Sequence, residues 1–201
     1  HLMNIKYILA ALLLMAAGGH ACAAPENPLG ALGNFINNTI ANNRFSIADM
    51  RGDWRYLSPA VSFQSHNVLQ GLGGAAAATA LESKLEPHYR RMGFNRTSLT
   101  VDEQDNFTLK LGLVALKGKI TKTDDDRLEF EFSAFGRVPL GKLTANATKA
   151  GDTLNLTFDA SRLINILTKV SGTLNNNTLS ALTDLLNSYD GVFIGFKLRK
   201  Q

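Results

Sequence analysis

Cysteine is almost absent from this sequence. Cys22 is the single thiol among 201 residues, and it lies at the end of an apolar N-terminal stretch. Residues 25–201 therefore contain no disulfide, no thiolate metal site and no cysteine nucleophile. A long apolar run is also missing. The longest stretch, 7–17, has about eleven residues, whereas a membrane-spanning helix needs about 20.

Histidine is scarce too, since only His66 and His88 of the four histidines follow residue 24. They fall in different predicted elements without the spacing of paired zinc ligands. The acidic run 124–126 lacks the glycine and distal glutamate of an EF-hand loop. Glu129 and Glu131 share one face of one predicted strand, which does not place two carboxylates in different environments. We therefore expect no catalytic residue, no metal ion and no cofactor, and we expect that the chain is not an enzyme.

The composition describes a folded protein with a modest excess of positive charge. Hydrophobic residues make up 45% of the chain, and the formal net charge is +4. These values argue against an intrinsically disordered chain. No basic motif with interleaved aromatic residues is present, so we do not expect nucleic-acid binding.

The N-terminal residues predict a secretory signal segment over 1–24. Lys6 gives a short positive region, the apolar stretch 7–17 follows, and Gly18 and Gly19 break it before a run of small residues. This order is typical of a signal peptide. We therefore expect an exported protein in the periplasm, or at the outer membrane or cell surface.

Two cleavage patterns fit this segment. In one, Cys22 becomes the lipidated first residue of a lipoprotein, and that N-terminal lipid is the only membrane association we expect. In the other, a signal peptidase cuts after Ala23 and Cys22 is lost with the signal.

The segment 25–44 is predicted as a linker or short N-terminal helix, and residues 45–201 as one domain. Residues 51–63 indicate one or two strands. The glycine-rich stretch 71–74 indicates a hinge before a long helix that starts at Ala75, with Pro87 kinking it or starting its second half. Gly93 is predicted to end this helix.

Between residues 97 and 158 the apolar period changes to two, with polar turns about every ten residues, which is typical of an antiparallel meander. Asp159 is predicted to cap a helix that carries 163–170 and ends at Gly172. After the loop 173–177, a second helix carries 179–189. A last strand, 192–198, is expected to close the sheet beside the first strand.

Several short motifs resemble known families. Gly52-Asp53-Trp54 matches the Gly-x-Trp of lipocalins, and the chain more closely resembles a Bacteroidetes family of lipocalin-like domains of unknown function. The resembling stretches are 52–54, 58–63, 73–78, 158–161, 186–191 and 195–198. The resemblance implies a mainly β fold with helices: a lipocalin-like antiparallel barrel of about eight strands. A long helix follows the first strands and two helices precede the last strand.

The candidate site residues are aromatic side chains expected inside the barrel. They are Trp54, Phe63, Phe107, Phe130, Phe132, Phe158 and Phe196. They would line a cavity for a small apolar ligand, or they would fill the barrel as side chains of small barrels often do. The first reading predicts a cell-envelope module that binds a small apolar molecule, a lipid or an envelope protein. The second predicts a structural or protein-interaction module with a solid barrel. The sequence predicts no oligomeric state.

Mass spectrometry of the membrane-extracted mature protein distinguishes the two cleavage patterns. The lipoprotein pattern predicts a chain that begins at Cys22 and carries acyl chains. A mature N-terminus at Ala24 without lipid would contradict that pattern and leave ordinary signal cleavage.

Overall fold

The computed structural model describes residues 45–63, 72–123, 127–170 and 176–201. The predicted signal segment 1–24 with Cys22, the segment 25–44, His66, the run 124–126 and Gly172 lie outside the described residues, so the predictions for them remain predictions. Within the described residues, no helix is long and apolar enough to cross a membrane.

Eight strands form a closed barrel in which every neighbouring pair is antiparallel, and the last strand closes the sheet on the first. The barrel order follows the chain order. The strands are β1 (Gly52–Phe63), β2 (Ser98–Val101), β3 (Asn106–Leu111), β4 (Val114–Lys122), β5 (Leu128–Ala134), β6 (Val138–Ala150), β7 (Thr153–Asp159) and β8 (Val192–Lys200). The predicted lipocalin-like barrel of about eight strands is confirmed.

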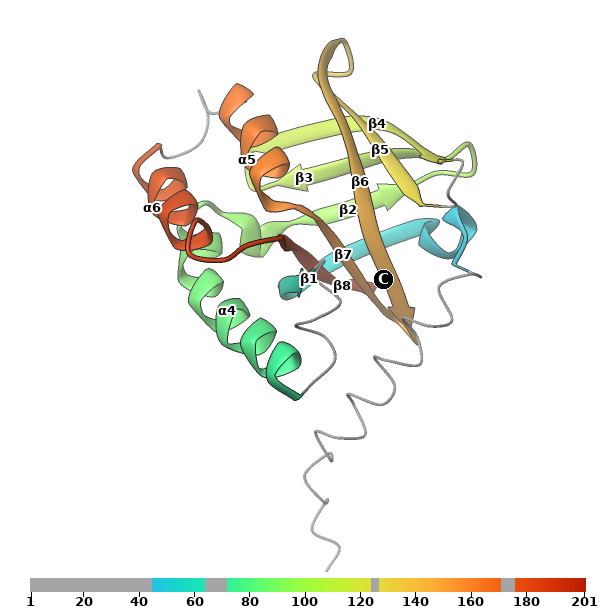
Figure 1. The fold of residues 1–201 in the computed structure, drawn as a ribbon. Coiled ribbons are helices and arrows are strands. Elements are labelled where there is room, and N and C mark those ends of the chain that lie inside the picture. The colour runs from blue at the N-terminus through green and yellow to red at the C-terminus, as the bar shows by residue number, and fades with distance from the viewer. Residues whose placement is uncertain (1–44, 64–71, 124–126, 171–175) are drawn as a thin grey trace, which may run out of the picture. The chain divides into compact units, whose positions relative to one another are not determined.

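Among the described residues, three α-helices accompany the barrel, and Figure 1 shows them gathered at one side of it. The helix α4 (Leu72–Arg91) follows β1, while α5 (Ala160–Lys169) and α6 (Asn176–Leu186) lie between β7 and β8. Two short 3-10 helices, η2 (Ile47–Met50) and η3 (Phe94–Arg96), flank the first strand and the long helix. This placement agrees with the predicted helix order.

Alternation of side chains explains why these segments form a barrel. In β3 the side chains of Phe107, Leu109 and Leu111 are buried, and Lys110 between them is exposed. A strand with one apolar and one polar face is stable when the apolar face turns inward. The same alternation recurs in β4, β5 and β7, so closing the sheet gathers all the apolar faces into one interior.

The start of α4 and both ends of α6 differ from the sequence-based prediction. The helix α4 begins at Leu72, inside the stretch predicted as a hinge, and it continues through Pro87 as one helix. Burial of Leu81 and Leu85 on its inner face offsets the helix cost of glycine, about 1 kcal/mol per residue. At its end, Gly93 adopts a φ of 77°, as a helix-ending glycine does.

The second of the two later helices is displaced relative to its prediction. It begins at Asn176, inside the predicted loop 173–177, and ends at Leu186. Tyr189 therefore lies in the turn that follows, where its N–H donates to the Leu186 carbonyl at 3.0 Å. Asn187 and Ser188 precede Tyr189, and both residue types favour turns over helix interiors.

The barrel has a seam because β2 is much shorter than β1. Only Gly52 to Arg55 of β1 pair with β2, whereas β8 pairs with β1 as far as Phe63. The helix α4 packs against β1, and the Glu82 carboxylate accepts the Val61 N–H at 3.1 Å. A helix side chain thus satisfies a strand donor that has no β2 partner.

Two glycines allow strands to approach each other more closely than any other residue would. A Cβ on Gly195 would overlap the carbonyl oxygen of Leu156 in β7, and one on Gly118 would overlap that of Glu131 in β5. Both obstacles are backbone atoms held in the sheet, so neither can move aside without breaking the local ladder.

We expect Gly195→Ala to lower the free energy of unfolding by about 3 kcal/mol, the upper range for overpacking. The control is Gly151→Ala, which meets no atom within 4 Å but has a φ of +59° and should cost only about 1 kcal/mol. Denaturant titration of both variants measures the difference. Equal losses would contradict the close strand approach at Gly195.

Candidate functional site

The structure places all seven aromatic candidates in the core of the barrel. Each is at most 7% exposed, and four of them are completely buried. They are Trp54, Phe63, Phe107, Phe130, Phe132, Phe158 and Phe196. If these side chains surround a space, the barrel has room for a ligand; if they fill that space, it has none.

Four of the phenylalanines form one cluster in the middle of the barrel. The ring centroid of Phe107 lies 5.0 Å from that of Phe130 and 5.2 Å from that of Phe132. Phe158 lies 5.2 Å from Phe130 and 5.7 Å from Phe132. These are contact distances for tilted and edge-to-face rings. The four rings therefore occupy the space that they enclose.

Phe196 belongs to a second cluster, which sequence reasoning did not find. Its ring lies 5.5 Å from Tyr89 and 6.1 Å from Phe94, and these two lie 5.4 Å apart. Tyr89 follows Leu81 and Leu85 at helical spacing, so its burial was predictable from the sequence, but its position inside the barrel cluster was not.

Trp54 and Phe63 lie outside both clusters. The indole N–H of Trp54 donates to the carbonyl of Met50 at 2.7 Å, and the ammonium of Lys200 lies 5.6 Å from the ring centre. Phe63 contacts Tyr189, with ring centroids 6.4 Å apart. Trp54 therefore packs against the short helix η2.

A polar network joins α4 to the barrel. Tyr56 donates to Glu86 at 2.7 Å, and Lys197 forms an ion pair with Glu82 at 2.8 Å. Tyr89 donates to the carbonyl of Gly195 at 3.1 Å. Burial above all, and then the two carboxylates, raise the pKa of Tyr89 above its ordinary value. The buried phenol therefore stays protonated and keeps its donor.

This network satisfies polar groups at the seam. Glu82 and Glu86 already have cationic or hydroxyl partners, and the nearby His88 is on the same helix with an unpartnered Nδ1. Across the described ranges, no group of three histidine, cysteine, aspartate or glutamate side chains gathers as a metal site.

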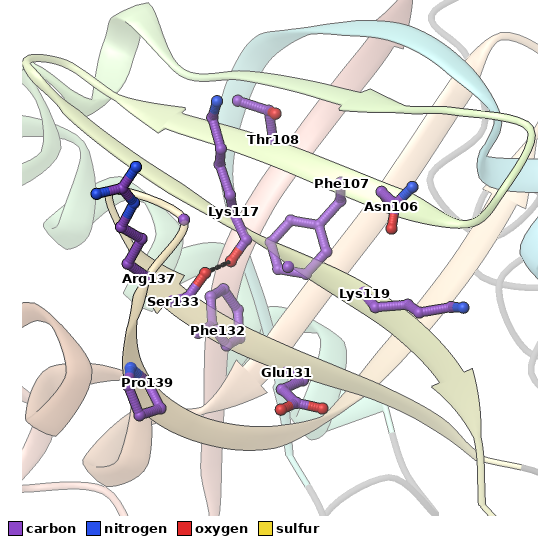
Figure 2. Close-up of a pocket in the computed structure, with 12 residues that line it drawn as sticks. Asn106, Phe107, Thr108, Lys117, Lys119, Glu131, Phe132, Ser133, Arg137 and Pro139 are labelled. Carbon is purple, nitrogen blue, oxygen red and sulfur yellow. Dashed lines mark hydrogen bonds between the residues drawn. The ribbon is translucent and has the colours of Figure 1, made fainter.

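An open depression of about 630 Å³ lies over β3, β4 and β5 (Figure 2). Phe107 and Phe132, whose side chains are buried in the barrel, contribute to its lining beside Gly118, and most of the other lining residues are polar. Its lining residues are Asn106, Phe107, Thr108, Lys117, Gly118, Lys119, Glu131, Phe132, Ser133, Gly136, Arg137 and Pro139. Figure 2 shows Lys117 and Arg137 extending away from the two phenylalanine rings.

Beside this depression, the turn between β5 and β6 carries an exposed aromatic residue in a strained backbone. Phe135 is 86% exposed, and its φ is 53°, followed by 68° at Gly136. The N–H of Arg137 closes the turn on the Ala134 carbonyl at 3.1 Å. Two positive φ values are typical of a type I′ turn, which favours asparagine or glycine at the position of Phe135.

The neighbouring turn, between β3 and β4, has the same character. Leu113 at its tip is 85% exposed. Gly112 before it has a φ of 62°, as the first position of a type II′ turn requires. Both turns lie at the same ends of adjacent strands, because Leu116 of β4 pairs with Ala134 of β5. We refer to Leu113 and Phe135 as the apolar tips.

Sequence reasoning missed the apolar tips because it assigned apolar residues in the meander to the interior. The sequence signal was an aromatic residue directly before a glycine, between two alternating segments. Phe135 and Gly136 have this arrangement. A hairpin turn of this length puts its central side chains outside the barrel.

A model of a protein family described as a lipocalin-like domain (DUF4923) matches residues 30–200. Neither curated proteins nor solved structures give a significant match to the chain. The family match confirms the lipocalin-like resemblance inferred from the motifs, while the Bacteroidetes origin stays a prediction.

The strained turn gives a direct stability prediction. Phe135→Asn should raise the free energy of unfolding by about 1 kcal/mol, because a left-handed backbone costs a bulky residue roughly 1–2 kcal/mol and asparagine less. Leu113→Asn is the matched control, since it removes an equally exposed side chain whose φ is not positive. Chemical denaturation measures both variants. A loss of stability in Phe135→Asn would contradict the strain.

Proposed function

Because the chain belongs to the family of lipocalin-like domains (DUF4923), we propose that it is a non-enzymatic binding module. Its barrel is a solid scaffold, and its outer surface makes the contacts. The observation that carries this proposal is the occupied interior. The rings of Phe107, Phe130, Phe132 and Phe158 contact one another where a carrier would hold its ligand.

The energy of the contacts among these four rings also favours a solid scaffold over a ligand carrier. An edge-to-face ring pair contributes about 0.5–1.5 kcal/mol beyond the area it buries. Moving the rings apart to admit a ligand would lose several such contacts at once. A small apolar molecule would have to replace all of them, so the interior favours stability over ligand exchange.

The surface over β3, β4 and β5 is the best candidate for binding. It combines the open depression with the apolar tips, and both are held by the closed barrel. Rigid strands that present exposed side chains on turns are a common arrangement for recognition.

We propose that the protein acts in the cell envelope, and this part of the proposal rests on the predicted signal segment 1–24. Its support is the short positive region, the apolar stretch and the small residues that follow. Export, or a lipid on Cys22, would place this protein in the envelope. Other envelope components would then meet the outer surface of its barrel.

Native mass spectrometry and displacement of a fluorescent fatty acid test the proposal. We expect the purified full chain to carry no small-molecule mass and to displace no probe. A stoichiometric bound lipid would contradict the solid scaffold and support the small-ligand carrier, particularly if Phe130→Ala, which enlarges the interior, changed its affinity.

A further inference from the structure

We propose that the apolar tips and the cations beside them dock the barrel on an anionic phospholipid surface. The inference deepens the proposed function, because it rests on binding by the outer surface and names the partner. Phe135 and Leu113 would enter the interfacial region, while Lys117 and Arg137 would contact phosphate groups.

The first step is that the backbone strain at Phe135 lowers the stability of the fold, while its side chain takes no part in the packing of the core. The ring is 86% exposed, and its backbone is in the left-handed region. Exposed single apolar residues are common, but a bulky residue at positive φ is not. Strain of this kind is found at functional sites. The ring has no contact with the aromatic clusters of the core.

The second step is that the apolar tips act together. Leu113 is as exposed as Phe135, and the two turns stand at the same ends of neighbouring strands. Val138, just after the second turn, is 54% exposed. Gly112 fixes the first turn, because a Cβ there would lie 3.2 Å from the Met92 and Gly93 carbonyl oxygens. The tips are therefore held on packed turns.

The third step is the charge around the tips. Lys110, Lys117 and Arg137 are exposed, and within the described ranges none of them forms an ion pair. The Cδ atom of Lys117 lies 4.0 Å from the position that a Cβ would take on Gly136. Lys117 therefore extends beside the β5–β6 turn. Positive charge just behind apolar tips complements an anionic membrane surface.

The area of the tips favours a lipid surface over a protein partner. A stable protein interface buries about 800 Å² on each partner. Two side chains provide much less than this, since a large aromatic residue buries roughly 150–250 Å². A lipid surface needs no shape-complementary pocket, and it gains from each inserted side chain and each cation separately.

Co-sedimentation of the full chain with vesicles tests the proposal. One set of vesicles is phosphatidylcholine alone, and the other is phosphatidylcholine mixed with phosphatidylglycerol. Wild type should bind the anionic vesicles more strongly, and added salt should weaken that preference. Phe135→Asn should lower the partition coefficient roughly tenfold or more. The variant should remain at least as stable as wild type, so misfolding cannot explain the loss.

A matched pair of charge variants isolates the cations. Lys117→Gln with Arg137→Gln should lower binding to anionic vesicles by about tenfold. Lys149→Gln with Arg199→Gln removes the same charge from β6 and β8 beside the β6–β7 turn, at the opposite end of β6 from the tips, and should leave binding unchanged. Every variant has the same N-terminal residues as wild type, so the fold-change between variants reports the substituted residues.

The inference would be overturned by equal binding of Phe135→Asn and wild type, by equal binding to both kinds of vesicle, or by an equal loss in the two charge pairs. A tip that captures a protein but not vesicles would also overturn it. These failures leave the solid scaffold intact. A bound small molecule in the barrel would instead contradict the proposed function, whatever the vesicles show.

Discussion

The contact of aromatic rings inside a closed sheet is the interaction on which the rest of this structure depends. An eight-stranded barrel has an interior just wide enough for its side chains. Here the ring centroids of Phe107, Phe130, Phe132 and Phe158 lie 5.0–6.1 Å apart in their contacting pairs, and the rings fill it. Gly118 lets two of the surrounding strands come close around that cluster. Because the rings contact one another, we propose that binding takes place on the outer surface.

The seam beside β1 is a second feature that shapes this barrel. A short β2 leaves part of β1 without a strand partner, and α4 covers that edge with the Glu82 carboxylate on the Val61 N–H. The same helix contributes Tyr89 to the cluster around Phe196. One helix therefore supplies both a polar cap for the sheet edge and an aromatic side chain for the core.

Much of the fold followed from side-chain periodicity. The alternation from Phe107 to Phe158 predicts the meander, and Asp159 predicts the start of α5, where it accepts the Arg162 N–H. Periodicity predicts which side chains point inward, but it does not predict how tightly they pack. The choice between a cavity and a filled barrel therefore depends on the ring distances. The tip at Phe135 was missed for a related reason, because a pattern rule assigns every apolar residue of a strand segment to the core.

Crystallography under xenon pressure tests the central claim most directly, because xenon enters empty apolar cavities. The account predicts no xenon density within the barrel among Phe107, Phe130 and Phe158, since their rings already fill that space. A well-occupied xenon site bounded by these rings would contradict it. The barrel would then be a ligand-holding cavity rather than a solid scaffold.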